Sequence, residues 1–398
     1  MANTFYPIAQ LENDILALAF GPLGGFSGRM LEGFIDETLA EFNKLNVPGY
    51  RFADPQSEVF YEQTVEKVAL APMAQYVDYN SDPIPYGVEG GESYTGKIPR
   101  MKSVEIIDEE KAEKIGQKAK LFGPRSGMLS AQDELRKRIQ TLIVGHKNAC
   151  TYQRMQMNSK GEFNIVVKNN TNGIRNVNFK AHIPATNFIT PSGENRWWKA
   201  LGIDGMTYTT EGSASDPIAD MQDIVRKAKL AGLVKGHFEV NTIFLDQILK
   251  HSAVLAYLGL DNQPNASAAD RAAWAGQKPR EWRKAKLEEA VGRKIVEFDD
   301  LVAVEVWDKA KKALKRDPFY AFENGRLSYV PDGIMGEFQT KIPYAVSGGQ
   351  YARFMNGLGL ITIEADYTHK IQTFTSELTT IGLPIAAQYV WIMNPVNL

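Results

Sequence analysis

The residues that could carry out catalysis or bind a metal are scattered along the chain rather than grouped. The five histidines are His146, His182, His237, His251 and His369. None of them has a second His or Cys at the spacing of a metal motif such as H-E-x-x-H or C-x-x-C. The sequence also lacks a G-x-S-x-G nucleophile elbow, a Walker loop and a G-x-G-x-x-G run after a predicted strand. We therefore predict no catalytic residues, no cofactor site and no metal site.

Paired acids and a tryptophan pair are the next features that could do chemistry. Two carboxylates act as an acid–base dyad only where their surroundings separate the two pKa values, so we interpret the acid pairs at 288–289 and 299–300 as solvated surface. Adjacent indole rings can stack on bases or sugars. Because the chain has a single such pair, at 197–198, beside Arg196 and Lys199, we interpret it as packing at the edge of a domain.

The Gly-rich run GPLGGFSG (21–28) is a third feature to weigh. It lacks the Lys-Ser/Thr pair that grips phosphate and a preceding strand, so it is not interpreted as a phosphate loop. The one cysteine, Cys150, is interpreted as a small core residue rather than a nucleophile. A long, well-patterned chain without a catalytic constellation favours a structural role.

Composition limits the classes of protein to consider. The chain has 398 residues, is 44% hydrophobic and 23% charged, and has a formal net charge of −2. These values are typical of a folded chain of two or three domains, and they argue against a dedicated nucleic-acid binder. One cysteine excludes an intrachain disulfide, as expected in reducing cytosol. We expect no signal peptide, and no apolar run approaches the roughly 20 residues that span a membrane.

The stretch 129–158 is the element that must position the others, and its pattern predicts one long helix. Ser130 and Asp133 match the side-chain pattern of a helix start. An apolar stripe recurs at helical steps, formed by Leu135, Ile139, Leu142, His146, Ala149 and Met157. The other face carries four bases that indicate a solvated or subunit-facing surface, namely Arg136, Lys137, Lys147 and Arg154. A helix of this length needs a surface to lie on.

Residues 65–107 predict a long two-stranded ribbon that leaves the body of the protein and returns. Four glycines and three prolines between 83 and 99 disfavour a helix or a central strand, and an alternating pattern resumes at Met101–Ile107. A two-stranded ribbon is marginally stable by itself in water. We therefore expect it to lie on a neighbouring chain, with a lid over an active site as the alternative.

The remaining segments predict a mixed α+β chain. The N-terminal part has one amphipathic helix, capped by Ser27, with Leu31, Phe34, Ile35, Leu39 and Phe42 on its apolar face. An Asn-Gly turn at 172–173 predicts a hairpin over 162–181. Residues 185–343 predict an α/β domain, with a helix opened by Asp216-Pro217, another capped by Thr242 and a polar helical insertion at 262–292. The end of the chain returns to a strand pattern.

This order of parts resembles the major capsid proteins of tailed bacteriophages, which have the HK-ninety-seven-type fold, and most of all the lambda-type capsid protein E family. The segments that carry the resemblance are YVDYNSDPIPYGVEGGESYTGKIPRMK, DELRKRI, KGEFNIVVKNN, YVPDGIMGEF and TFTSELTTIGLPIAAQYVWIMNPV. The layout matches over nearly the whole chain, while each motif alone is loose. The insertion at 262–292 and the Gly-rich run at 21–28 depart from the pattern.

The resemblance implies an α+β chain in five parts. These are an N-terminal arm (1–64), an E-loop ribbon with flanking P-domain strands (65–107), a P-domain with the spine helix and hairpin (108–184), a mixed α/β A-domain (185–343) and a P-domain return with C-terminal strands (344–398). It implies a non-enzymatic protein, made in the host cytoplasm, whose partners are other copies of itself in hexamers and pentamers. The resemblance also implies contacts with a portal and with scaffold or decoration proteins. Packaged DNA would be a non-specific neighbour of the shell.

Within this picture, the ribbon residues form the expected intersubunit contact. The nine residues are Tyr86, Val88, Glu89, Glu92, Tyr94, Lys97, Ile98, Arg100 and Lys102. The alternative for any one of them is a solvated loop position. For the whole chain, the alternatives are an encapsulin-like nanocompartment shell, a hydrolase with a Gly-rich lid and, third, a tail-tube protein.

Overall fold

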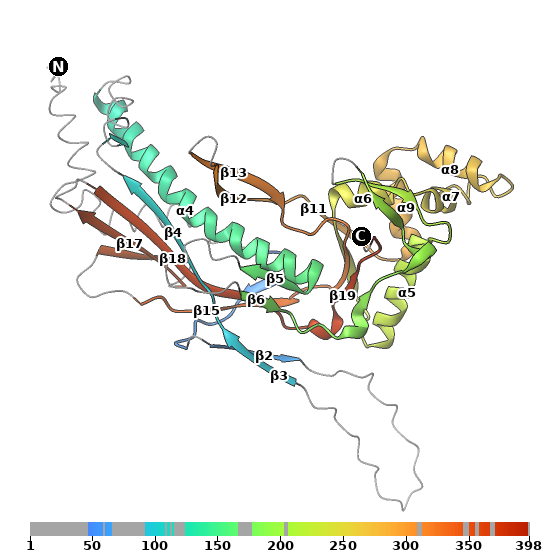
Figure 1. Ribbon diagram of the computed structural model, residues 1–398, viewed down its shortest axis with the longest axis horizontal. Coiled ribbons are helices and arrows are strands. Elements are labelled where there is room, and N and C mark those ends of the chain that lie inside the picture. The colour runs from blue at the N-terminus through green and yellow to red at the C-terminus, as the bar shows by residue number, and fades with distance from the viewer. Residues whose placement is uncertain are drawn as a thin grey trace, which may run out of the picture. The chain divides into compact units, whose positions relative to one another are not determined.

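The computed structural model (Figure 1) describes residues 47–58, 60–65, 92–107, 110–111, 114, 124–165, 177–202, 206–308, 313–344, 350–354, 358–366 and 371–396. The chain forms two compact units. Unit 1 takes its described residues from Met1–Tyr61, Gly96–Cys150 and Phe338–Ile381, and unit 2 from Glu62–Thr95, Thr151–Glu337 and Gly382–Leu398. Helices and strands mix in both, so the expected α+β class is confirmed.

Unit 1 is built on a six-stranded sheet. Its strands are β1 (Tyr50–Phe52), β15 (Gly336–Lys341), β18 (Ile371–Pro384), β17 (Gly359–Asp366) and β16 (Gln350–Phe354), in that order, with β4 (Arg100–Ile107) paired antiparallel to β18. Exposed and partly buried residues alternate along β4, as expected of a strand with one covered face. Residues 100–107, expected as the returning strand of the ribbon's flank, therefore belong to this sheet.

Helix α4 (Pro124–Lys160) confirms the predicted long helix and extends it at both ends. The helix begins at Pro124, and proline is tolerated at a first helical position because its missing N–H has no helical partner there. At 37 residues, α4 is about 55 Å long. Leu142, His146 and Met157 from the predicted stripe are buried, and Ala149 is partly buried.

The predicted polar face of α4 is wrong at Arg154. Lys137 is exposed and Lys147 is partly exposed, but only 1% of Arg154 is accessible. All residues from Gln153 to Ser159 are buried, so the end of the helix is enclosed on every side. Amphipathic periodicity predicts one buried face and cannot anticipate complete enclosure.

Unit 2 contains a five-stranded mixed sheet covered by helices. The strand order is β11 (Ile295–Phe298), β10 (Gly236–Asn241), β14 (Leu327–Pro331), β19 (Trp391–Met393) and β7 (Phe188–Ile189). β10 runs parallel to β11 and antiparallel to β14, and β19 runs antiparallel to β14 and parallel to β7. The helices are α5 (Pro217–Leu230), α6 (Thr242–Ile248), α7 (Ser252–Leu258), α8 (Ala268–Gly276) and α9 (Arg280–Val291).

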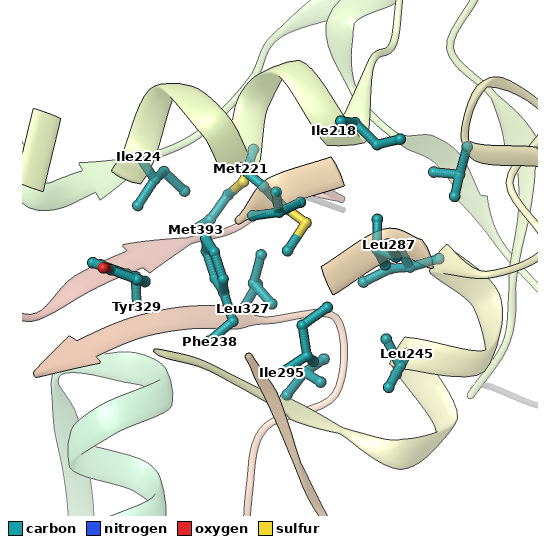
Figure 2. Packing of buried hydrophobic residues seen from close by; sticks show 14 of the residues in the cluster. Ile218, Met221, Ile224, Phe238, Leu245, Leu287, Ile295, Leu327, Tyr329 and Met393 are labelled. Carbon is teal, nitrogen blue, oxygen red and sulfur yellow. The ribbon is translucent and has the colours of Figure 1, made fainter. Parts of the chain in front are cut away.

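Helix α5 shows how local sequence determines this unit. Asp216 accepts a hydrogen bond from the backbone N–H of Ala219 at 3.1 Å, and Pro217 occupies the first turn. The predicted face, Ile218, Met221, Ile224, Val225 and Ala228, is buried. Figure 2 shows Met221 of α5 near Met393, in a cluster that also contains Phe238 and Leu287. The cap of α6 is Asn241 rather than the expected Thr242, because the Asn241 carboxamide accepts from the N–H of Ile243.

Four further strand pairs form two-stranded sheets. They are β2 (Phe60–Val65) with β3 (Glu92–Lys97), β5 (Glu162–Ile165) with β6 (Val177–Lys180), β8 (Trp198–Leu201) with β9 (Tyr208–Glu211), and β12 (Leu301–Asp308) with β13 (Ala313–Tyr320). The hairpin predicted over 162–181 is confirmed in β5 and β6, while its Asn-Gly turn lies outside the described residues. Short 3-10 helices occupy Ala185–Asn187, Gly193–Asn195 and Ala387–Tyr389.

A matched pair of leucines tests the packing of unit 2. Leu287 of α9 is fully buried, whereas Leu230 of α5 is 66% exposed. Leu287→Ala should lower the free energy of unfolding by about 2–5 kcal/mol because it leaves a cavity, and Leu230→Ala should change it by less than about 0.5 kcal/mol. All six tryptophans lie in unit 2, so denaturant unfolding followed by tryptophan fluorescence reports on this unit. Equal losses in the two variants would contradict the packing.

Candidate functional site

The nine residues predicted at the intersubunit contact fall into three groups. Tyr86, Val88 and Glu89 lie outside the described residues. Glu92, Tyr94 and Lys97 lie on β3, whose backbone pairs with β2. The other three residues, Ile98, Arg100 and Lys102, follow β3 and lead into the sheet of unit 1.

Those three residues have partners within their own chain. Ile98 is 3% exposed. The Arg100 guanidinium donates to both carboxylate oxygens of Glu377 on β18, with Nε at 2.5 Å from Oε1. Lys102 Nζ lies 3.8 Å from the same carboxylate. The pairing follows from the strand register, which sets Lys102 directly opposite Glu377. Their part in a contact with another chain stays a prediction.

One face of the unit 1 sheet is covered by α4. Arg138 of the helix donates to Glu105 of β4, and His146 Nε2 lies 2.9 Å from Ser376 Oγ of β18. Burial lowers the pKa of His146 to about 4, so the ring is neutral at pH 7 and meets the serine hydroxyl as an uncharged partner. This face is therefore an internal packing surface.

The opposite face of the same sheet, which we call the outer face, exposes apolar side chains. Val104 and Ile106 of β4 are 50% and 46% exposed, and Tyr351 of β16 is 42% exposed. The register puts Thr375 beside Val104, and Thr362 between Thr375 and Tyr351. Directly opposed residues share a face, so these side chains form a continuous strip across four strands. Sequence reasoning missed this strip, although the alternation of β4 was a signal for it.

A serine, a histidine and a glutamate in unit 2 have the composition of a hydrolytic triad. Ser215 Oγ lies 3.1 Å from His251 Nε2, and His251 Nδ1 lies 3.9 Å from Glu211. The protons are in the wrong places for catalysis. The N–H of Ala253 donates to Nδ1 at 3.2 Å, which makes Nδ1 an acceptor and leaves the ring proton on Nε2.

A histidine that carries its proton on Nε2 cannot accept the serine proton there. The Ser215 hydroxyl donates instead to the carbonyl of Gly212 at 2.6 Å. Burial also lowers the pKa of His251, and the ring is 1% exposed. The group is a buried helix cap for α7, and it does not support the hydrolase alternative.

The other residues singled out from the sequence are packing residues. Trp197 and Trp198 are buried, and Trp197 Nε1 donates to Asp220 at 2.7 Å, which confirms the packing interpretation. Cys150 is fully buried, and burial raises the pKa of its thiol to about 12, as expected of an inert core residue. Over the ranges that the structure describes, no three His, Cys, Asp or Glu residues are arranged to hold a metal ion. None of the described helices could cross a membrane.

The most unusual arrangement of charge is a buried ion pair in unit 2. Arg154 of α4 donates to Glu239 of β10, and the two side chains are 1% and 0% exposed. The Asn158 amide donates to the second oxygen of Glu239 at 2.9 Å, and the Arg154 guanidinium lies 4.5 Å from the ring centre of Phe298. Burial alone raises the pKa of Glu239, but the charge of Arg154 and hydrogen bonds from His237 and Asn158 outweigh it and lower the pKa.

His237 extends this pair to the surface. Its Nδ1 lies 2.7 Å from Asp332, and its Nε2 lies 3.5 Å from Glu239. Burial lowers the pKa of His237, but the hydrogen bonds to the two carboxylates outweigh that effect, and the net pKa is raised. Two carboxylates and two potential cations thus form one connected network, which fixes α4 on the sheet of unit 2.

Comparison with known proteins gives similarity to shell proteins at low sequence identity. No family model matches the chain, and no curated protein matches it. A prophage capsid protein of Escherichia coli CFT073 is 11% identical, with 77% of this chain and 79% of that chain covered and a TM-score of 0.43.

The mature capsid of bacteriophage PhiM1 is 10% identical, with 87% and 86% covered and a TM-score of 0.39. The SrpI encapsulin of Synechococcus elongatus PCC 7942 is 9% identical, with 87% and 85% covered and a TM-score of 0.36. Similarity at this level does not assign a function by itself.

The buried pair predicts a large loss when one partner is removed. Glu239→Gln leaves the buried Arg154 charge uncompensated and should cost about 3–5 kcal/mol. Adding Arg154→Met to that variant should lower the free energy of unfolding by much less than a further ~3–5 kcal/mol, because the two residues act as a unit. The control is Asp223→Asn, which breaks a surface pair with Lys227 on α5 and should have a small effect. Additive losses in the double variant would contradict the pairing.

The raised pKa of His237 predicts a pH dependence with a definite sign. A histidine whose pKa is raised by folding contributes stability in full below its unfolded pKa of about 6.5, and loses it as the pH rises through the folded pKa. His237→Gln should therefore destabilise the protein more at about pH 5.5 than at about pH 8.5. His182→Gln is the control, because burial and Lys180 lower the pKa of His182. A larger loss for His237→Gln at alkaline pH would contradict this account.

Proposed function

We propose that this chain is the major capsid protein of a tailed bacteriophage. It assembles with other copies of itself, as hexamers and pentamers, into an icosahedral shell that encloses packaged double-stranded DNA. The observation that carries the proposal is the pairing of β2 and β3, which pair with each other and with no other strand in the described part of the chain. Residues 66–91 connect these two strands.

Two strands paired only with each other are marginally stable in water by themselves. The segment between them is rich in Gly and Pro, which cannot extend a regular sheet. Contact with a neighbouring copy would supply the missing surface, and each copy in a closed shell would both give and receive such a contact. This reasoning supports an intersubunit contact made by the nine ribbon residues as a set. Ile98, Arg100 and Lys102 also have partners within their own chain.

The finer assignments belong to the same proposal. The chain would have the HK-ninety-seven-type fold, with α4 as spine helix, residues 66–91 as the E-loop tip and residues 185–343 as the A-domain, and it would be nearest to the lambda-type capsid protein E family. A net charge of −2 suits a wall against DNA, because strong phosphate contacts would impede filling and release. A portal and scaffold or decoration proteins would be further partners in the virion.

Shortening the ribbon tests the proposal. Replacing residues 66–91 by a four-residue Gly/Asn turn leaves β2 and β3 in the chain and removes the segment that would contact a neighbour. We expect soluble monomers or capsomers and no closed particles, measured by mass photometry and negative-stain electron microscopy of the expressed protein.

The control replaces the mostly exposed loop residues 261–266 between α7 and α8 by Gly and Ser at equal length, which should leave assembly intact. Normal particles from the shortened ribbon would overturn the proposed contact. A small stable oligomer from the unaltered chain would overturn the shell itself. Particles without nuclease-protected DNA, made in phage-infected cells, would favour an encapsulin-like shell.

A further inference from the structure

The outer face of the unit 1 sheet carries an exposed apolar strip, whereas Leu360 and Glu377 on the same face are buried. Val104, Ile106 and Tyr351 are between 42% and 50% exposed, while the opposite face of the same strands packs on α4. Three threonines, Thr362, Thr373 and Thr375, complete the strip and are only partly buried. A sheet that is covered on one side and carries apolar side chains on the other has a surface suited to a second layer.

We propose that residues 28–46 of the same chain form the missing layer, as an amphipathic helix lying on the outer face. The sequence places Leu31, Phe34, Ile35, Leu39 and Phe42 on one side of such a helix. These five side chains need an apolar surface, because a short helix in water is marginal without tertiary packing. The outer face offers that surface on the part of the molecule to which the segment is joined.

The connection of the chain brings the segment to the right place. Val47 is 1% exposed, and β1 begins three residues later, at Tyr50, beside β15 in the same sheet. On β15, Thr340 Oγ1 lies 2.9 Å from Thr380 Oγ1 of β18. From Thr380 to Thr373, the far end of the strip, β18 extends about 23 Å at 3.3 Å per residue. A helix over residues 28–46 would be about 28 Å long, so it is long enough to reach the exposed strip from the start of β1.

Charge also favours this occupant. Residues 28–46 carry four acids and two bases, namely Glu32, Asp36, Glu37, Glu41, Arg29 and Lys44. The outer face carries three bases and two acids, namely Arg100, Lys102, Arg353, Glu364 and Glu377. Opposite net charge helps the two surfaces to associate and sets their register more than it sets their affinity. The proposal concerns one chain and does not depend on shell formation.

Disulfide trapping tests the contact directly. Ile35→Cys lies on the apolar side of the segment, and Gly33→Cys, two residues away, lies on the opposite side at 100° per residue. Each is combined with Val104→Cys in a Cys150→Ala background and exposed to mild oxidant. We expect the Ile35 variant to form a disulfide within one chain several-fold faster than the Gly33 variant, as read from non-reducing gels and peptide mass spectrometry.

Equal rates for the two variants, or no disulfide in either, would overturn the proposal. Disulfides between chains alone would also overturn it and would make the outer face an interface between copies. A second measurement guards against misfolded cysteine variants. Val104→Asp with Ile106→Asp should increase hydrogen exchange in peptides from residues 28–46 several-fold, whereas Leu230→Asp, at a 66% exposed position on α5, should not. Unchanged exchange in the strip variant would contradict the docking.

Discussion

The buried ion pair between Arg154 and Glu239 is the interaction on which this structure depends. Both charges are removed from water, and each is acceptable there only because the other is present. The surrounding hydrogen bonds complete the site, because Gln153 accepts from the N–H of Gly382 at 2.9 Å and Gln156 donates to the carbonyl of Ala321 at 2.8 Å. The last turns of α4 are thereby held by strand, loop and C-terminal segments of unit 2.

The same helix serves both units, since the boundary between them falls after Cys150. Before that point α4 covers one face of the unit 1 sheet through Arg138 and His146, and after it α4 is enclosed in unit 2. The sheet face that packs against α4 in unit 1 has its partners within one chain. Assembly with other copies is our proposal for the β2–β3 ribbon, and the N-terminal segment is our proposal for the outer face of the unit 1 sheet.

Local patterns predicted the elements that local physics controls. The long helix followed from periodicity without proline, and α5 followed from its Asp-Pro start and its apolar face, which is buried at each predicted position. Arg154 was misplaced because its partner, Glu239, is 85 residues away, and no local pattern records such a distance. The pairing of Arg100 with Glu377 was missed for the same reason. The outer face depended on strand register, which only the fold determines.

The central claim is that the ribbon between β2 and β3 lies on another copy of the chain. The most direct measurement is electron cryo-microscopy of particles assembled from the unaltered protein, at a resolution that traces residues 66–91. The account predicts density for this segment against the body of an adjacent subunit, repeated around each capsomer. Density that turns back onto its own chain, around a cleft with converging polar groups, would contradict the account.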